Sequence, residues 1–508
     1  MVRWMMLVSG MMLLWALPSV SQADEAAVDS PLSPAEFQTL KRQMFGGLDI
    51  TFSGFARIEG TAEQHFDLGS PLLGAGGAGN SFYDFRGWLA SRIAKGPAAL
   101  HIAVNYAGND FSDPEGGVFG NAFDATATPG GPAVVRQKGF DLRIRHLYLS
   151  YDGFMKASAG RMASRIGHGI SIQTIRDSAK LGKRFGPISI TGVLVKGGET
   201  QPNSVTPNVS AATSDNDLDA YGLVINYHLP SKQHMIVRQA DSASGLIVEN
   251  RNILQLAIVK QVDTTFDERF PEKLLFNING DFRLGSWSYA FETAYLAGRT
   301  PRATALGLGR RKNRAWMGYV KGQYDFDVRQ ASLALALGAG SGDNQGGEKQ
   351  RDFQSFFMNA IGFHLANIYG NDIYGYDAFL PGSRAGADGN NAGGGFANTG
   401  FIQISGKVAP FSMLPDSTIE GVFTYLRATR SQRVGEGVLL GGLDGFVAAP
   451  GVTATSHDIG WEADINIIHP LTPDMHAYLR SGWFVPGAIF GTGRRNAFKL
   501  QGGIDFSF

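Results

Sequence analysis

The chain has 508 residues, of which 67 are Gly and none is Cys. The absence of Cys excludes disulfides, thiolate zinc sites, cysteine-ligated iron–sulfur clusters and a cysteine nucleophile. The 45 Lys and Arg residues balance the 45 Asp and Glu residues, so no net charge favours nucleic acid as a partner. With 44% hydrophobic residues and 34 Phe, the composition is too apolar for a disordered chain.

The first 23 residues have the parts of a secretory signal peptide. Arg3 gives the positive start, an apolar stretch follows, and Ser21-Gln22-Ala23 places small residues at the cleavage site. An uncleaved anchor is the alternative, but Pro18 leaves the apolar segment short for a membrane span. The sequence therefore predicts a signal peptide over residues 1–23 and export from the cytoplasm.

Residues 24–46 lack alternation of polar and apolar residues. We interpret them as a periplasmic leader that holds one short helix between Pro34 and Met44, with a flexible tail as the alternative. Beyond residue 23, no apolar run approaches the ~20 residues of a membrane helix. Two classes remain, a soluble exported protein and a membrane β-barrel.

From residue 47 onwards, apolar and polar residues alternate with a period of two. Ile50, Phe52 and Ile58 alternate with Ser53 and Glu59, and equivalent patterns lie at 100–106, 276–295, 459–467 and 498–508. Successive residues of a strand face opposite sides, so each strand has one apolar and one polar face. A β-sandwich also alternates, so this pattern alone does not separate the two classes.

Aromatic residues and connector lengths favour the membrane barrel. We expect Trp287, Trp461, Phe506 and Phe508 to belong to aromatic girdles at the membrane interfaces. Tight turns at 96–97, 152–153, 186–187, 285–286 and 472–474 contrast with long loops at 67–81, 110–138, 197–216, 341–397 and 431–456. Short periplasmic turns and long extracellular loops are typical of outer-membrane barrels of Gram-negative bacteria.

The strand pattern predicts one transmembrane antiparallel β-barrel over residues 47–508, with about 18 strands. Ten residues at ~3.3 Å each, tilted by ~40°, rise about 25 Å, which is the height of the apolar band. The segment Gly245–Glu249 is either a short strand or part of a loop, so the range is 16 to 20 strands. An open sheet edge in lipid would leave unpaired backbone groups, so we expect closure.

Two short motifs carry a resemblance to a known family. Gly160-Arg161 is placed at the end of a strand and is followed by Ile166-Gly167-His168-Gly169, and Gly460-Trp461 leads through Trp483-Phe484 to the last strand. These stretches resemble the alginate-export-type, porin-like outer-membrane barrels of Gram-negative bacteria. The resemblance implies a large porin-like barrel. The terminal Phe508, on an alternating strand, resembles the signal that the barrel-assembly machinery recognises, which makes that machinery an expected partner.

If the apolar faces contact lipid, the polar faces line the lumen. A charge that faces lipid costs about 2 to 4 kcal/mol at mid-bilayer for Arg, so the charged residues must point inward. Many of these charges could have a purely structural role, in which they pair with one another across strands. Others could create an electric field in the lumen that selects solutes. The predicted pore-lining residues are Arg57, Arg86, Arg92, Arg143, Arg145, Lys156, Asp281, Arg283, Glu462, Asp464 and Arg480.

A barrel of about 18 strands encloses more space than its wall side chains fill. We expect the loop 341–397 to fold inward and narrow the pore, and a compact external loop with its own small core is the alternative. The rings that would form the constriction are Phe353, Phe356, Phe357, Tyr369, Tyr374 and Tyr376.

No HExxH, GxSxG or phosphate-binding glycine motif occurs in a suitable setting, so we expect no cofactor, no metal and no enzymatic activity. The sequence favours an outer-membrane channel for passive passage of small polar or charged solutes through a mixed-charge lumen. Two alternatives remain open. The barrel could be an enzyme acting on lipid or peptide, or a structural sleeve for polymer export or for an electron-transfer partner.

Overall fold

A computed structural model gives the structure of the chain. It describes residues 42–44, 48–64, 80–107, 141–169, 171–199, 217–229, 252–263, 272–304, 307–326, 331–342, 349–350, 365–368, 398–410, 416–433, 454–491 and 494–508. In this part of the chain no helix is long and apolar enough to cross a membrane.

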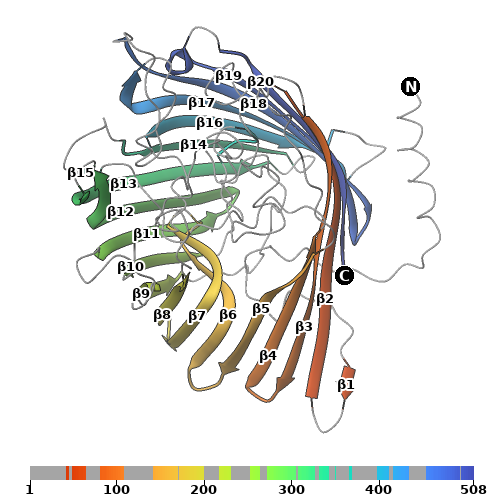
Figure 1. Ribbon diagram of the computed structural model, residues 1–508. Coiled ribbons are helices and arrows are strands. Elements are labelled where there is room, and N and C mark those ends of the chain that lie inside the picture. Colours follow the sequence, from red (N-terminus) through yellow and green to blue (C-terminus); the bar gives the residue numbers. More distant parts are fainter. Residues whose placement is uncertain are drawn as a thin grey trace.

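Eighteen strands form the wall of a barrel (Figure 1). Two further strands are very short, β1 (Arg42–Met44) and β15 (Lys349–Gln350). The wall strands are β2 (Leu48–Gln64), β3 (Asn80–Lys95), β4 (Ala98–Ala107), β5 (Asp141–Asp152), β6 (Lys156–Ile166), β7 (Ile172–Phe185), β8 (Ile188–Glu199), β9 (Asp217–His228), β10 (Ile253–Asp263), β11 (Glu272–Leu284), β12 (Trp287–Thr304), β13 (Gly307–Asp325), β14 (Ser332–Gly340), β16 (Thr399–Val408), β17 (Thr418–Arg433), β18 (Thr455–Thr472), β19 (Met475–Pro486) and β20 (Ala497–Ser507).

Each wall strand pairs antiparallel with its neighbours, and the first and last strands close the barrel. Arg57 of β2 lies opposite Asp505 of β20 in this closing ladder. The Arg57 guanidinium donates to the Asp505 carboxylate through Nε, at 2.5 Å from Oδ1, and through a second nitrogen. Closure leaves no wall edge at the seam, which confirms the predicted all-β transmembrane barrel of about 18 strands.

The outer face of the barrel is apolar, as the alternation predicts. Ile58 is 57% exposed whereas its neighbour Glu59 is 5% exposed, because the two side chains point to opposite sides of β2. Trp287, Phe506 and Phe508 of the predicted girdles are all exposed on the outside. Apolar side chains can be exposed in a band around a barrel only when lipid covers them, so the barrel spans a membrane.

Aromatic rings of the outer face gather near the short-turn end of β12 and β13. The Trp287 ring lies 4.9 Å from Tyr324 and 6.1 Å from Tyr289. On β18 and β19, farther from the short turns, the Trp461 ring lies 5.4 Å from the Trp483 ring. Rings therefore occur at two levels of the outer face, and their assignment to membrane girdles stays a prediction.

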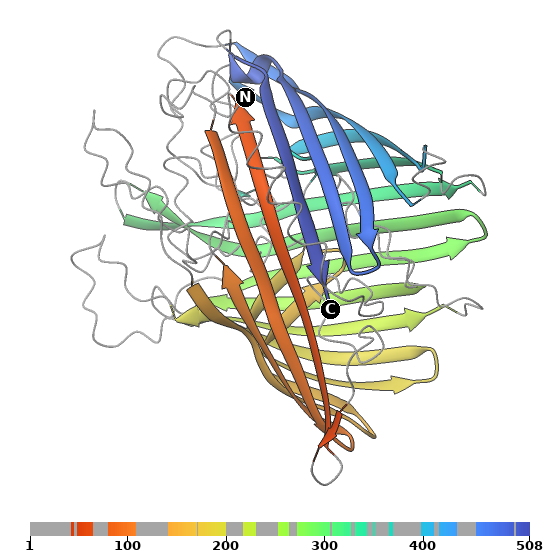
Figure 2. The same ribbon diagram turned by 90° about the vertical axis from the view of Figure 1, so that its right-hand side faces the viewer.

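Most connections follow the predicted rhythm. Tight turns join β3 to β4, β7 to β8, β11 to β12 and β18 to β19 at the end where the chain terminates (Figures 1 and 2). The connection between β9 and β10 lies at this same end and yet spans 229–252, which departs from the expected short periplasmic turn. The possible strand Gly245–Glu249 lies inside it and outside the described residues.

Two local predictions are wrong. Gly160-Arg161 does not end a strand, because β6 continues to Ile166. The predicted helix does not reach Met44, because Arg42–Met44 forms the short strand β1, which pairs with β2 from Leu48 to Ile50. The signal peptide and the rest of the leader lie outside the described residues and stay predictions.

Candidate functional site: the lumen of the barrel

The hairpin of β6 and β7 leaves the wall part of the way along its length. The ladder between β5 and β6 ends at Leu147 opposite Arg161, and the ladder between β7 and β8 ends at Ser178 opposite Val195. The pairing of β6 with β7 nevertheless continues as far as Ile166. The outer half of this hairpin therefore belongs to the interior and not to the wall.

A sharp inward bend produces this departure. Gly160 has φ +125°, and a Cβ there would lie 2.4 Å from the Leu147 carbonyl oxygen, so only glycine fits. On the inside of the bend, the Lys180 ammonium donates to the Ala163 carbonyl at 2.7 Å. These contacts hold the upper hairpin folded over its own base.

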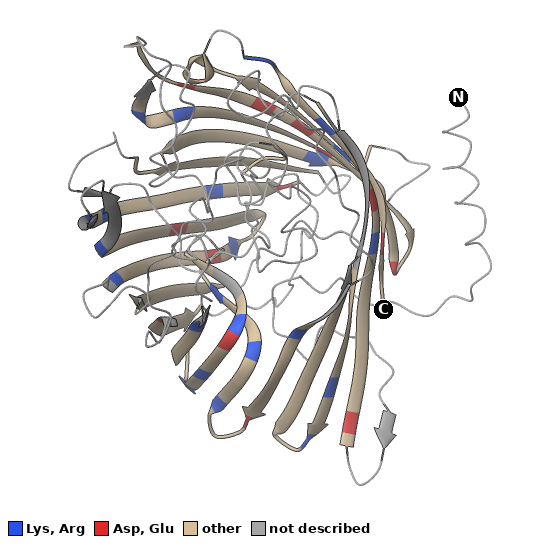
Figure 3. Ribbon diagram, in the orientation of Figure 1, with Lys and Arg blue, Asp and Glu red and all other residues tan. Residues whose placement is uncertain are grey.

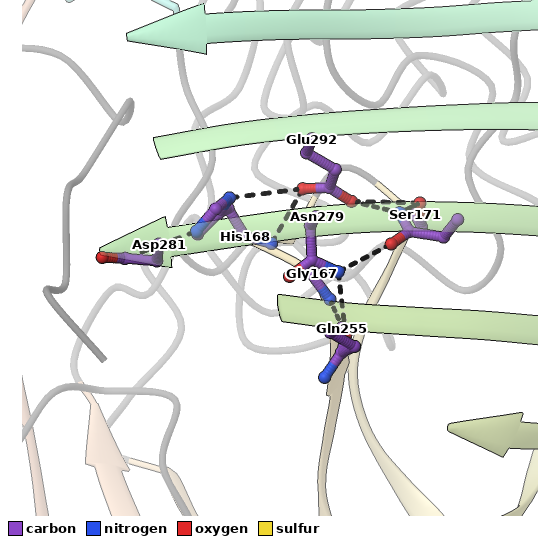
Figure 4. Close-up of polar contacts among 8 residues, drawn as sticks. Gly167, His168, Ser171, Gln255, Asn279, Asp281 and Glu292 are labelled. Atoms are coloured by element: carbon purple, nitrogen blue, oxygen red, sulfur yellow. Dashed lines mark hydrogen bonds and ion pairs between the residues drawn. The ribbon is translucent and has the colours of Figure 1, made fainter. Parts of the chain in front are cut away.

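The tip of the hairpin docks on the inner wall formed by β10, β11 and β12 (Figure 4). The Glu292 carboxylate of β12 accepts the backbone N–H of His168 at 2.8 Å and the Ser171 hydroxyl at 3.1 Å. The Asn277 amide donates to the same carboxylate at 2.6 Å, and the Gly167 N–H donates to Gln255 Oε1 at 2.8 Å. Charge-assisted bonds to a buried carboxylate are among the stronger hydrogen bonds in proteins, so the tip is firmly anchored.

Polar side chains extend this anchor along the wall. Asn279 donates to Gln255 Oε1 at 3.0 Å, Gln255 donates to Asn226 Oδ1 at 2.8 Å, and Asn226 donates to the Ser189 hydroxyl at 3.3 Å. The resulting network joins β8 to β12 through inward-facing polar groups. A buried polar network of this kind is stable only when its members satisfy one another.

His168 lies at the centre of the docked tip. Its side chain is 2% exposed, with Nε2 3.5 Å from the Asp281 carboxylate and Nδ1 3.9 Å from the Glu292 carboxylate. The ring also lies 5.9 Å from the ring of Tyr319. The turn residue of the sequence analysis is therefore an interior group that faces two buried acids.

A second segment lies against the inner wall on the other side of the interior. Residues Leu365–Ile368, within the connection between β14 and β16, are buried. The Ile368 N–H donates to the Glu462 carboxylate at 2.6 Å, and Gln403 donates to the Leu365 carbonyl at 2.8 Å. Residues Leu365–Ile368 thus lie against inward-facing side chains of β16 and β18. The six rings expected to form a constriction lie outside the described residues.

The predicted pore-lining residues fall into different environments. Asp281, Glu462 and Asp464 face inward and are buried, and Arg57 pairs with Asp505. Arg92, Arg145 and Arg480 are partly exposed, and the Arg480 guanidinium lies 4.7 Å from the centre of the Tyr478 ring. Lys156 and Arg283 sit at the short-turn end, where Lys156 pairs with Asp152 and Arg283 with Asp325, both at 3.2 Å. The side chains of Arg86 and Arg143 lie outside the described ones.

Acidic and basic groups of the wall differ in their exposure. Seven described acids within the wall strands are buried: Glu59, Asp281, Glu292, Glu420, Glu462, Asp464 and Asp505. Bases elsewhere in the wall are buried as well, namely Lys273, Lys321 and Lys499. On β3 to β7, however, six bases are partly exposed, namely Arg92, Arg145, Arg161, Arg165, Arg176 and Lys180. Figure 3 shows Lys and Arg positions repeated along the hairpin of β6 and β7, with others on strands around the barrel. The net balance of the whole chain conceals this separation.

A serine and a histidine on the inner wall come within hydrogen-bonding distance. His101 Nε2 lies 2.8 Å from the Ser150 hydroxyl, and its ring stacks on Tyr148 at 4.3 Å. A catalytic histidine needs an acid that holds its other nitrogen. Within the described residues, His101 Nδ1 has no hydrogen-bond partner, and the register partner of His101 on β3 is the base Arg92. This pair lacks the third member of a hydrolytic triad.

The docking residues of the hairpin were not identified from the sequence. Glu292 and Asn277 alternate with apolar residues and so belong to polar strand faces, but no local pattern marks them, Ser171 or Gln255 as a docking site. One signal was present, because Arg161 and Asp177 occupy positions that an intact wall strand would turn toward lipid. Such a pair is a sign that a strand has left the wall.

No protein-family model and no curated protein matches the sequence, so the alginate-export-type resemblance stays a prediction. Among solved structures, OccK1 (OpdK) of Pseudomonas aeruginosa aligns with 11% identity and TM-score 0.49, over 90% of this chain and 98% of that chain. Acinetobacter baumannii OccAB1 aligns with 10% identity and TM-score 0.48, over 90% and 96% of the two chains. A BenF-like porin from Pseudomonas fluorescens Pf-5 aligns with 11% identity and TM-score 0.47, over 90% and 98%.

These values are too low for the likenesses to bear on function. The class of protein follows from the chain itself, because its strands close into a barrel and its lipid-facing side chains form an apolar band. Bilayer-spanning barrels of this construction, with short turns at one end and long loops at the other, are those of outer membranes. The chain is an outer-membrane β-barrel protein of a Gram-negative bacterium.

Proposed function

We propose that the protein is a channel for passive passage of small polar solutes and that it favours anions. The observation that carries this proposal is the unequal exposure of charge, with buried acids around the wall and partly exposed bases gathered on β3 to β7. A group that remains in contact with water acts on a passing solute more strongly than one enclosed by hydrogen-bond donors. The charge lining a pore sets which ions pass.

Two inward segments use acids of the wall as anchors. Glu292 receives donors from the β6–β7 tip, and Glu462 receives the N–H of Ile368. These carboxylates are consequently engaged by the protein itself. Arg92 of β3 and Arg145 of β5 are partly exposed, and in this proposal they are the charges that a solute meets.

The same segments define where the solute would travel. The hairpin tip covers β10 to β12, and Leu365–Ile368 covers β16 and β18, so the path would run beside β2 to β5. This proposal retains the expected constriction and assigns it to two inserted segments instead of one. A narrow path that is displaced from the barrel axis and has bases on one side would admit small anions and slow larger solutes.

The zero-current potential across a planar bilayer with unequal KCl concentrations tests the proposal. We expect a chloride-favouring potential for the unmodified protein and a loss of that preference in the double variant Arg92→Gln, Arg145→Gln. Lys95→Gln is the control, because Lys95 ends the same strand β3 as an exposed residue at the turn. Cation preference in the unmodified protein would overturn the anion assignment, and absence of conductance would overturn the channel.

Two cheap measurements separate the alternatives. Lipase and protease assays on the purified protein test the barrel enzyme, for which the Ser150–His101 pair is the described candidate. Purification with a bound polymer or redox protein, together with poor conductance, would support the structural sleeve. We expect neither activity nor a co-purifying partner.

A further inference from the structure

The departure of the β6–β7 hairpin leaves part of the wall without its two strands. Strand β5 pairs with β4 as far as Asp141, but its ladder with β6 stops at Leu147. Strand β8 pairs with β9 as far as Glu199, but its ladder with β7 stops at Val195. In the described part of the chain, the outer ends of β5 and β8 are thus edges without a ladder partner between them.

The hairpin does not fill this interval, because apolar side chains on both faces of its upper half are buried. Met162 is 1% exposed and its neighbour Ala163 is 5% exposed, although consecutive residues of a strand point in opposite directions. Ile166 and Ile172, at the tip, are 3% and 1% exposed. A hairpin that remained in the wall would show lipid one of these faces.

The break begins within the membrane. Arg161 is five residues beyond Lys156, the first residue of β6, and five residues at ~3.3 Å with a ~40° tilt rise about 13 Å. The apolar band is about 25 Å tall, so the interval opens in the half nearer the long loops. That half corresponds to the outer leaflet. Two absent strands correspond to as many as three strand spacings, about 14 Å in all.

The side chains around the interval change from apolar to charged at the level of the break. Below the break, the outer face of β5 and β7 is apolar, with Leu149 63% and Leu181 54% exposed. At the break, Arg161 follows on the same face of β6, and its register partner Asp177 is exposed. Two charged side chains at this level cannot face acyl chains without a large cost, so they face away from the lipid.

We propose that this interval is a lateral opening between the outer leaflet and the lumen, and that amphipathic carboxylates use it. The apolar rim, which includes Ile144 at 54% exposure and Leu147 at 44%, would contact the tail of such a molecule. Arg161 and Arg165 on the hairpin, with Arg145 on β5, would attract its carboxylate inward. A neutral amphiphile would lack that attraction. This route is additional to the axial path of the proposed channel.

Photolabelling tests the opening in phosphatidylcholine vesicles that contain the full-length protein. The probe is a medium-chain carboxylate with a diazirine on the chain, and the matched control probe is the alcohol of equal length. We expect the carboxylate to label the rim near Ile144 and Leu147 about fivefold or more above the alcohol. The variant Arg161→Gln, Arg165→Gln should lower that ratio to near one. Equal labelling by the two probes, or labelling spread evenly over the lipid-facing band, would overturn the proposal.

A flux measurement adds a test that does not depend on the arginines. Ile144→Trp puts a bulky side chain on the rim, and Leu149→Trp puts the same side chain on the same face of β5 below the break. We expect Ile144→Trp alone to slow entry of the carboxylate from the membrane by several-fold, with the conductance for chloride unchanged. If both variants behave like the unmodified protein, the lateral route is wrong. A protein that conducts chloride and yet fails these tests would retain the proposed channel and lose only the opening.

Discussion

The backbone N–H of His168 donates to the carboxylate of Glu292 at 2.8 Å, and this bond joins the tip of an inward hairpin to the inner wall of the barrel. The partners are 124 residues apart in sequence. Glu292 is completely buried and accepts two further donors, so it is the main anchor of the tip.

Replacement of Glu292 should release the hairpin. In Glu292→Ala the donors of His168, Ser171 and Asn277 lose their acceptor, and each buried donor left unsatisfied costs about 1–3 kcal/mol. We expect a higher or more fluctuating single-channel conductance and a lower unfolding temperature. Glu292→Gln retains one acceptor oxygen, so its conductance and unfolding temperature should lie between those of Glu292→Ala and the unmodified protein.

Ser288→Ala is the matched control for this experiment. Ser288 lies on the same inward face of β12, is fully buried, and its hydroxyl has no hydrogen-bond partner among the described residues. We expect its conductance to equal that of the unmodified protein. If Glu292→Ala also leaves conductance unchanged, the hairpin does not limit the current.

The bend of the hairpin depends on Gly160. Gly160→Ala adds a Cβ against the Leu147 carbonyl in a backbone conformation that costs an alanine about 1–3 kcal/mol. We expect slower assembly of the barrel and a lower unfolding temperature, measured by the heat-dependent shift in electrophoretic mobility. Gly421→Ala provides the comparison, because a Cβ at Gly421 on β17 meets nothing within 4 Å. Equal effects of the two substitutions would contradict the role of the bend.

The seam between β2 and β20 offers a test of closure. The side chains of Arg57 and Asp505 are 12% and 4% exposed, so removal of one partner leaves an uncompensated buried charge, at a cost of about 3–5 kcal/mol. We expect Asp505→Asn to lower the unfolding temperature markedly and to make the chain at the β2–β20 seam susceptible to cleavage by proteases.

An exposed pair serves as the control for the seam. Lys156 and Asp152 are 75% and 68% exposed at a turn, where an ion pair contributes only about 0–1 kcal/mol. Lys156→Gln should therefore leave the unfolding temperature almost unchanged. Comparable losses in Lys156→Gln and Asp505→Asn would show that the seam pair has no special part in closure.

Seating of the second inward segment depends on Gly482 of β19. A Cβ at this position would lie 2.9 Å from the Asp464 carboxylate, 3.0 Å from the Ile368 side chain and 3.1 Å from Asn367. Gly482→Val should displace the segment and raise the conductance in a planar bilayer. Deletion of the loop around it should have the same effect. A conductance that falls or stays constant in both proteins would remove this segment as a constriction.

The wall could be predicted from the sequence because each wall strand is recognisable from the pattern of its own residues. The contrast between Ile58 and Glu59 on β2 is a period-two signal that needs no knowledge of any other strand. The strand number followed from the spacing of such segments and the closure requirement, and it is confirmed. The location in a membrane follows from the apolar outer faces of the same strands.

The lumen could not be predicted in this way because its contacts are long-range. Met162, Ala163 and Ser164 of β6 are buried in succession, so the alternation that marks a wall strand is lost there. Gly167-His168-Gly169 is a turn by sequence, but nothing local indicates that it docks on Glu292 of β12. Separation of exposed bases from buried acids depends on which carboxylates receive backbone donors, which only the fold determines.

The central claim is that apolar faces contact lipid while polar faces are enclosed, and tryptophan quenching by brominated lipids tests it most directly. Trp287 is 47% exposed on the outside, whereas Trp88 is 9% exposed and packs inside with Phe55 and Ala90. We expect strong quenching in a variant whose only tryptophan is Trp287 and almost none in a variant whose only tryptophan is Trp88. Strong quenching of Trp88 with none of Trp287 would contradict the assignment of the two faces.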